Sequence, residues 1–327
     1  MKYALFVVLL FTSISSFAQD CDKELLSQKP GKWKAGPQGS VQNVSATDLV
    51  KEKSVMTGIH KMISSSYKPK GCEISYSTAF GKNLPAGRNW IADPYTYSMF
   101  ILRYLCDAGS ADKSKYYVDY STPTTVNISA NVIWAFNMYG AELPEDDMRG
   151  YLRLDKRPEK KDGFYFMGEE VVGDSHSENK IKEYRWLITY TDTLPFTYVS
   201  RRDYLLIQKE RLEKYIKEVP SEKKYSDAYL KNISEFLKKP ASELDQVAIC
   251  MRNEEERFEK FVPEGTRGSF IAVQPNPAYY HRKLPKSSPQ FFTVVYKISH
   301  GDAVFEENIS NIKKTVDFEA LKKMLGK

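Results

Sequence analysis

The sequence predicts an α+β fold in which antiparallel sheet regions are interrupted by an inserted helical block, in one or two domains. Three observations support this prediction. Strand-like segments precede and follow a run of helical periodicity, several helical segments begin at capping-box serines, and regular alternation of single strands with single helices is missing. The last observation argues against a doubly wound nucleotide-binding fold.

The first eighteen residues have the pattern of a cleavable export signal. Lys2 precedes the apolar run 4–11, and Ser16-Phe17-Ala18 is the small-x-small pattern that a signal peptidase accepts. The run is shorter than the roughly 20 residues of a membrane-spanning helix. We therefore expect residues 1–18 to be removed, leaving an exported protein, periplasmic or extracellular, without an integral membrane segment.

The next two regions are predicted to be an irregular lead-in and a mainly antiparallel β region with one helix. Residues 19–45, rich in Lys, Gly, Pro and Gln, form the lead-in, and 46–160 form the second region. Ser45 and Asp48 begin a helix over about 46–66. Strands are expected at 96–106, 115–120 and 125–136. In the last of these, apolar residues alternate with Thr125, Asn127, Ser129 and Asn131, so one face should be buried and the other solvated.

A charged stretch at 155–163, with Pro158 and a terminal Gly163, marks the predicted division of the chain. The region 161–327 is predicted to be α+β, with a helical block at about 203–262. We expect one helix after Ser200, a second over 223–238 and a third from Ser242 toward Val262. Strands are predicted at 164–172, 181–191, 196–199, 268–274 and 290–298, the last of them central, and a short helix at 317–325.

Composition and charge exclude some classes of protein. With 42% hydrophobic residues the chain can bury a sizeable core. The formal net charge is only +6, without a concentrated basic stripe, so nucleic acid is not an expected partner.

Four cysteines allow two disulfide bonds in an oxidising compartment. Cys72 and Cys106 lie in strand-like segments of one region, and neighbouring strands can bring such side chains within bridging distance, which favours this pair. Cys21 and Cys250 would then pair by elimination. Buried free thiols are an equally weighted alternative for some of the four.

The familiar catalytic motifs are missing. The chain lacks Gly-x-Ser-x-Gly, a phosphate-binding loop and His-Glu-x-x-His. Asp174, His176 and Glu178 are spaced as on one strand face, but their small polar neighbours favour a solvated turn, so we predict neither a metal nor a cofactor.

Two further kinds of catalytic residue are a nucleophilic cysteine and a pair of carboxylates. Cys250 is a poor nucleophile candidate because the acidic run 254–256 follows it and would suppress thiolate formation. Paired carboxylates, with Glu169 or Glu170 as a contributor, are harder to dismiss because a glycosidase needs only two at a suitable separation.

Two aromatic segments are candidate binding sites. Trp186 and Tyr190 belong to an aromatic stripe on one face of a strand. Such a stripe can stack on a ligand, but we favour the interpretation that it is core and is covered by the helical block that follows it in sequence. The proline-rich loop 274–289 contains Tyr279, Tyr280, His281 and Arg282, which prolines can present at low ordering cost. The alternative is a long connection packed back on the sheet.

The leader ending Phe17-Ala18-Gln19, with the runs 184–189 and 276–280, resembles exported, uncharacterised proteins of Bacteroidota-type Gram-negative bacteria. This resemblance implies a compartment and no activity. The first functional hypothesis is a non-catalytic binding or interaction protein of the cell envelope, whose partner is an envelope protein or glycan. The alternative is an envelope hydrolase that cleaves glycan or peptide through carboxylates.

Overall fold

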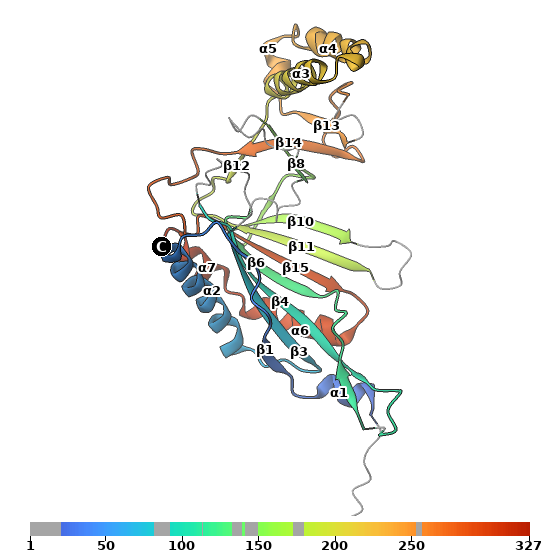
Figure 1. Cartoon of the computed structure of the whole chain (residues 1–327), viewed down its shortest axis with the longest axis vertical. Helices are drawn as coiled ribbons and strands as arrows, with labels where there is room; N and C mark the ends of the chain where they lie inside the picture. The colour runs from blue at the N-terminus through green and yellow to red at the C-terminus, as the bar shows by residue number, and fades with distance from the viewer. Residues whose placement is uncertain are drawn as a thin grey trace, which may run out of the picture.

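The computed structural model describes residues 21–81, 92–112, 114–132, 139–140, 150–172, 180–252 and 257–327, with backbone alone at 139–140. Within these residues the chain forms two β-sheets, a group of helices along the larger sheet, and a separate helical block beyond the smaller one (Figure 1). The predicted α+β class is confirmed. No described helix is both long and apolar enough to cross a membrane.

The elements of the first half of the chain are mostly strands. In order they are α1 (Lys23–Gln28), β1 (Lys32–Ala35), β2 (Val41–Gln42), α2 (Ala46–Ser66), β3 (Cys72–Gly81), β4 (Tyr95–Cys106), β5 (Tyr116–Val118), β6 (Thr125–Ala130), β7 (Tyr139–Gly140), β8 (Leu152–Leu154) and β9 (Glu159–Lys161).

The second half contains the helical block and both central strands. Its elements are β10 (Phe164–Val172), β11 (Ile181–Ile188), β12 (Phe196–Tyr198), α3 (Arg201–Glu218), the short 3₁₀ turn η2 (Pro220–Glu222), α4 (Lys223–Phe236), α5 (Ala241–Leu244), β13 (Ile249–Met251), β14 (Ser269–Pro275), β15 (Phe292–Ser299), α6 (Ala303–Thr315) and α7 (Phe318–Met324).

The larger sheet has the order β1-β3-β4-β6-β15-β11-β10-β9, with β2 and β5 added at β3 and β4. Strand β15, close to the C-terminus, lies between β6 and β11 and pairs antiparallel with both, as Figure 1 shows. The prediction of a central strand there is confirmed. The sheet takes strands from both sides of the predicted division at 155–163, where Asp162 and Gly163 turn the chain from β9 into β10.

Helices α2, α6 and α7 cover one face of the larger sheet and form its core. Alternate residues of β4, β6 and β15 point into this core. From the helices come Met56, Ile59, Ile63, Phe305, Ile309, Ile312 and Leu321. The prediction of a helix over 46–66 is confirmed, and Ser45 caps it by accepting from the Asp48 amide at 3.1 Å.

The smaller sheet has the order β12-β14-β8-β7, with β13 added at β14. One core joins it to β10 and β11 through Met167 and Leu187, and a second core joins its other side to α3 and α4. The predicted third helix from Ser242 toward Val262 is wrong. Within the described part of this stretch the α-helix is limited to α5, because Ile249 and Cys250 pair with β14 and are buried.

The lead-in predicted as irregular contains α1, β1 and β2. Strand β1 pairs in parallel with β3, and Trp33 packs against the main core, donating its indole N–H to the Tyr67 carbonyl at 3.1 Å. At Gly31 the backbone is so close that a Cβ would lie 2.2 Å from the Cys72 carbonyl oxygen. These contacts are long-range, so local composition did not reveal them.

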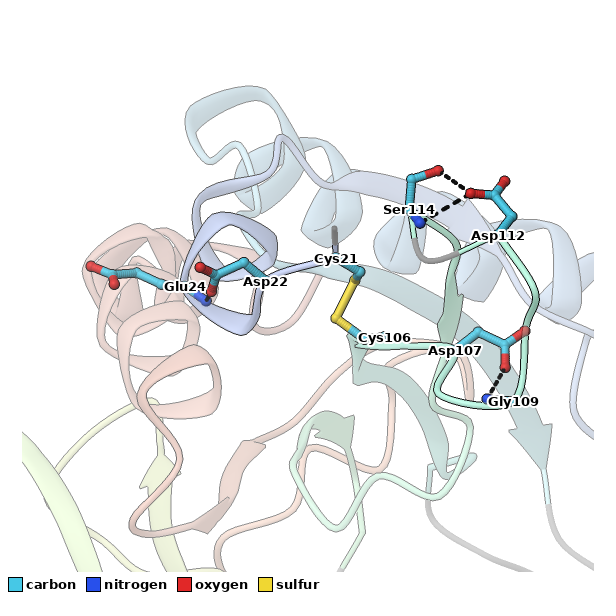
Figure 2. Close-up of a disulfide and its surroundings, with 8 residues drawn as sticks. All are labelled: Cys21, Asp22, Glu24, Cys106, Asp107, Gly109, Asp112 and Ser114. Atoms are coloured by element: carbon cyan, nitrogen blue, oxygen red, sulfur yellow. Dashed lines mark hydrogen bonds between the residues drawn. A yellow bond between two sulfur atoms is a disulfide. The ribbon is translucent and has the colours of Figure 1, made fainter. Parts of the chain in front are cut away.

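A disulfide joins Cys21, just before α1, to Cys106 at the end of β4, with their Cα atoms 5.6 Å apart (Figure 2). The predicted Cys72–Cys106 and Cys21–Cys250 pairings are therefore wrong. In the β3–β4 register Cys72 lies opposite Arg103, three residues before Cys106, and its thiol points into the core beside Asn308. Cys72 and Cys250 are buried free thiols, the alternative left open for some of the four.

Replacing both bridged cysteines by serine should lower the free energy of unfolding by about 4.5 kcal/mol, because the bond closes a loop of 85 residues in the unfolded chain. Urea unfolding measures this loss. Reductant should bring the wild type to the stability of the variant and leave the variant unchanged. A peptide map of the oxidised protein in which Cys106 is linked to Cys72 would contradict the pairing.

Candidate functional site

The face of the larger sheet opposite α2, α6 and α7 carries accessible polar side chains. Along β4, buried residues alternate with half-exposed Thr96 and Ser98 and with Phe100, which is 38% exposed. Strand β6 repeats the pattern with half-exposed Thr125 and Asn127. We call this surface the open face and define it by Ser75, Ser77, Ser98, Phe100, Thr125, Asn127, Val295 and Lys297.

The strand register arranges the open face in two neighbouring rows. One row runs Ser75, Phe100, Thr125, Lys297 across β3, β4, β6 and β15. The next runs Ser77, Ser98, Asn127, Val295 across the same strands. Because residues opposite one another on paired strands point to the same side, the rows form one continuous patch in which five of the eight side chains are Ser, Thr or Asn.

The charged groups at the two margins of the open face are held in ion pairs. At the β1 margin, the buried Glu73 carboxylate lies 3.1 Å from Lys32 Nζ and 3.3 Å from Lys34 Nζ. At the β11 margin, Arg185 pairs with Glu170 at 3.3 Å and with Glu183. The β1 margin thereby keeps one excess positive charge and the β11 margin one excess negative charge, and the floor between them is mainly polar.

Aromatic rings gather at one end of the open face, near the disulfide. Phe100 is 38% exposed, Tyr116 41% and Tyr120 68%, and we call these three residues the aromatic end. Lys34 Nζ lies 3.5 Å from the Tyr120 hydroxyl, and the Tyr116 ring packs at 5.2 Å from that of Tyr104. These contacts place Tyr120 over β1 and Tyr116 over the end of β4.

A second feature is a buried acidic pair formed by Glu52 of α2 and Asp93, just before β4. Glu52 is 0% exposed and Asp93 6%. Among the described residues, neither carboxyl oxygen of Glu52 has a hydrogen-bond partner. Burial raises the pKa of Glu52 to about 8, and the charges of Asp93 and Asp48 act in the same direction. The pKa of Asp93 is also raised, mainly by burial. At neutral pH Glu52 therefore keeps its proton.

A hydrogen-bond network holds the segment 286–291 beside this acidic pair. The Asp93 amide donates to the Lys286 carbonyl at 2.8 Å, and Ser287 Oγ donates to Asp48 at 2.8 Å. Asn131, with φ of 60°, donates to the Asp93 and Ser288 carbonyls and accepts from the Gln290 amide. The segment is thereby a fixed part of the core.

The acidic pair should make stability depend on pH. Because the pKa of Glu52 is higher in the folded than in the unfolded protein, stability is full below the ordinary carboxyl pKa and is lost as pH rises toward 8. One pKa unit of difference corresponds to about 1.4 kcal/mol. Glu52→Gln, which mimics the protonated acid, should raise the melting temperature at pH 8.5 by several degrees and flatten its decline between pH 5 and 8.5.

Melting curves of the wild type and of Glu52→Gln across this pH range check that prediction. The exposed Glu259→Gln variant is the control and should follow the wild type. A Glu52→Gln protein that melts below the wild type at pH 8.5 would show that the carboxylate is stabilised by its surroundings.

The predicted binding loop 274–289 is largely packed back on the sheet. Tyr279 is 5% exposed and donates its hydroxyl to the Gln290 carbonyl at 2.6 Å. Tyr280 is half-buried and donates to the Pro195 carbonyl at 3.2 Å. Both rings pack in the core between the sheets. His281 and Arg282 are exposed, and the His281 ring meets that of Tyr190 edge-on at 5.0 Å.

The predicted aromatic stripe of β11 is part of the core, but the helices that cover it are not the predicted ones. Trp186 lies 5.5 Å from the Phe318 ring of α7, and Phe318 also contacts Phe164. Tyr190 packs between the main core and the core that joins the sheets. The helical block α3–α5 instead covers the far side of the smaller sheet (Figure 1), because the C-terminal helices return to β11.

The other sequence candidates contribute little to a site. Glu169 lies 3.5 Å from Lys182, and Glu170 is paired with Arg185. The possible metal ligands Asp174, His176 and Glu178, and the acidic run 254–256 after Cys250, lie outside the described residues. Among the residues the structure describes, no three His, Cys, Asp or Glu side chains are grouped to hold a metal ion.

Sequence reasoning found one strand of the open face and missed the rest. The alternation at 125–131 predicted a solvated side, which is correct for Thr125 and Asn127 and wrong for Ser129 and Asn131, both 5% exposed. Nothing local shows that Ser77, Ser98 and Val295 lie beside Asn127. Glu52 had a signal: it falls four residues before Met56 on the apolar stripe of α2, where a carboxyl group is out of place. No family model, curated protein or solved structure matches the chain.

Proposed function

We propose that this chain is an exported, non-catalytic binding protein of the cell envelope, periplasmic or extracellular, and that it contacts its partner with the open face. The observation that carries the proposal is that two register-aligned rows of accessible polar side chains lie on the sheet face opposite the covering helices. Such a preformed sheet surface holds its side chains in place before a partner arrives, which lowers the cost of ordering them.

The leader pattern and the disulfide support the compartment. A bond between Cys21 and Cys106 is compatible with an oxidising environment, where such bonds form and persist. Cys21 is two residues beyond the expected start of the mature chain, so the bond also ties the new N-terminus to β4. Export and folding would thus be linked through one covalent contact.

Two observations favour binding over hydrolysis by carboxylates. Glu169 and Glu170 are held in ion pairs with Lys182 and Arg185, so neither side chain is free to act on a substrate. Glu52 has such a pKa, but its side chain is fully buried under α2 and a substrate cannot touch it. Binding to an envelope glycan or protein needs neither group.

The proposal is tested by blocking the centre of the open face. Ser98 and Asn127 lie directly opposite each other, so the double variant Ser98→Arg/Asn127→Arg should cover both rows with long charged side chains. We expect the immobilised variant to retain at least fivefold less carbohydrate and protein from solubilised envelopes than the wild type, measured by sugar analysis and mass spectrometry.

The matched control is Ser65→Arg/Ser242→Arg, which adds the same charges at exposed positions of α2 and α5. It should retain as much material as the wild type. Circular dichroism melts of both variants verify folding. Equal retention by the wild type and a folded Ser98→Arg/Asn127→Arg protein would refute the proposed surface.

A further inference from the structure

We infer that the open face binds a neutral polysaccharide, an inference that rests on the binding function proposed above and specifies its ligand. The rows contain three serines, a threonine and an asparagine, which can both donate and accept hydrogen bonds. A sugar chain displays the same two capacities along its length. Hydroxyl and amide side chains on a firm sheet are therefore chemically matched to a polyhydroxyl ligand.

The charge distribution favours a neutral chain over an acidic one. Glu73 lies between Lys32 and Lys34, and Arg185 lies between Glu170 and Glu183. The single excess positive charge at the first margin is offset by a single excess negative charge at the second, so the two margins together carry no net charge to attract carboxylated or sulfated polymers. Lys297, on the floor of the open face, lies opposite Glu183 in the register of β11 and β15.

The aromatic end supplies the apolar part of sugar recognition. Pyranose rings have C–H faces that stack on aromatic rings, and the rings of Phe100, Tyr116 and Tyr120 are all more than a third exposed. Phe100 lies in the same row as Ser75 and Thr125, so one ligand can meet a ring and a hydroxyl group together.

The extent and polarity of the patch favour a chain of sugars over a folded protein partner. Neighbouring strands are about 4.8 Å apart, so the four strands β3, β4, β6 and β15 span about 14 Å, longer than one sugar. The centre of a protein interface is usually enriched in apolar and aromatic residues. Here the inner positions of the two rows are Ser98, Phe100, Thr125 and Asn127, three polar side chains and one ring, while Tyr116 and Tyr120 lie at one end.

The test is retention of the mature protein on insoluble polysaccharides. Cellulose, starch, xylan and mannan represent neutral chains, pectin represents an acidic chain, and an envelope protein fraction freed of glycan represents a protein partner. We expect retention on at least one neutral polysaccharide, unaffected by 0.5 M salt because the contacts are uncharged. Phe100→Ala/Tyr120→Ala should weaken that retention at least tenfold, and Ser98→Arg/Asn127→Arg should abolish it.

Tyr225→Ala is the matched control, because Tyr225 of α4 and Tyr120 are both 68% exposed and Tyr225 belongs to the helical block. Its retention should stay within twofold of the wild type. Retention on pectin alone, or equal retention by the folded Phe100→Ala/Tyr120→Ala protein, would overturn the inference.

A different result separates this inference from the binding function itself. If the wild type retains envelope proteins through the open face and no neutral polysaccharide, the ligand class is wrong and the binding function stands. If it retains none of the probes, both are wrong.

Discussion

The pairing of β15 with β6 on one side and β11 on the other is the constraint on which the structure depends. This strand comes from the end of the chain and completes a sheet whose other strands come from much earlier segments. Its register places Val294 and Tyr296 on the helix side, where α2, α6 and α7 bury them. A shift by one residue would turn these side chains outward and expose the core.

The same register determines the opposite face. Once Val294 and Tyr296 are buried, Val295 and Lys297 must lie beside Asn127 and Thr125, and these in turn beside Ser98 and Phe100. The open face is thus a consequence of how the core is packed, and its polar composition shows which side of the sheet meets solvent. A surface made in this way is as rigid as the sheet that carries it.

The acidic pair lies on the covered side of the sheet and has a different role. Glu52 is placed where an apolar residue would be expected, against Asp93 and near the segment 286–291 that closes the core. A buried carboxyl without a donor costs stability when it is ionised. Its protonation therefore couples the packing of α2 to pH, at a place remote from the open face.

The sequence by itself determined the elements whose signals are local. The Ser45 and Ser200 caps, the alternation at 125–130 and the apolar run of β15 were enough to predict helices, strands and an α+β class. Only the tertiary structure decided which cysteines pair, that residues 32–35 form a strand, that 249–251 leave the helical block, and that the C-terminal helices cover Trp186. Each of these features depends on a contact with a residue far away in the chain, and local composition does not reveal such contacts. The open face belongs to the same class, because its polar residues are unremarkable on each strand and form a surface only when the strands are side by side.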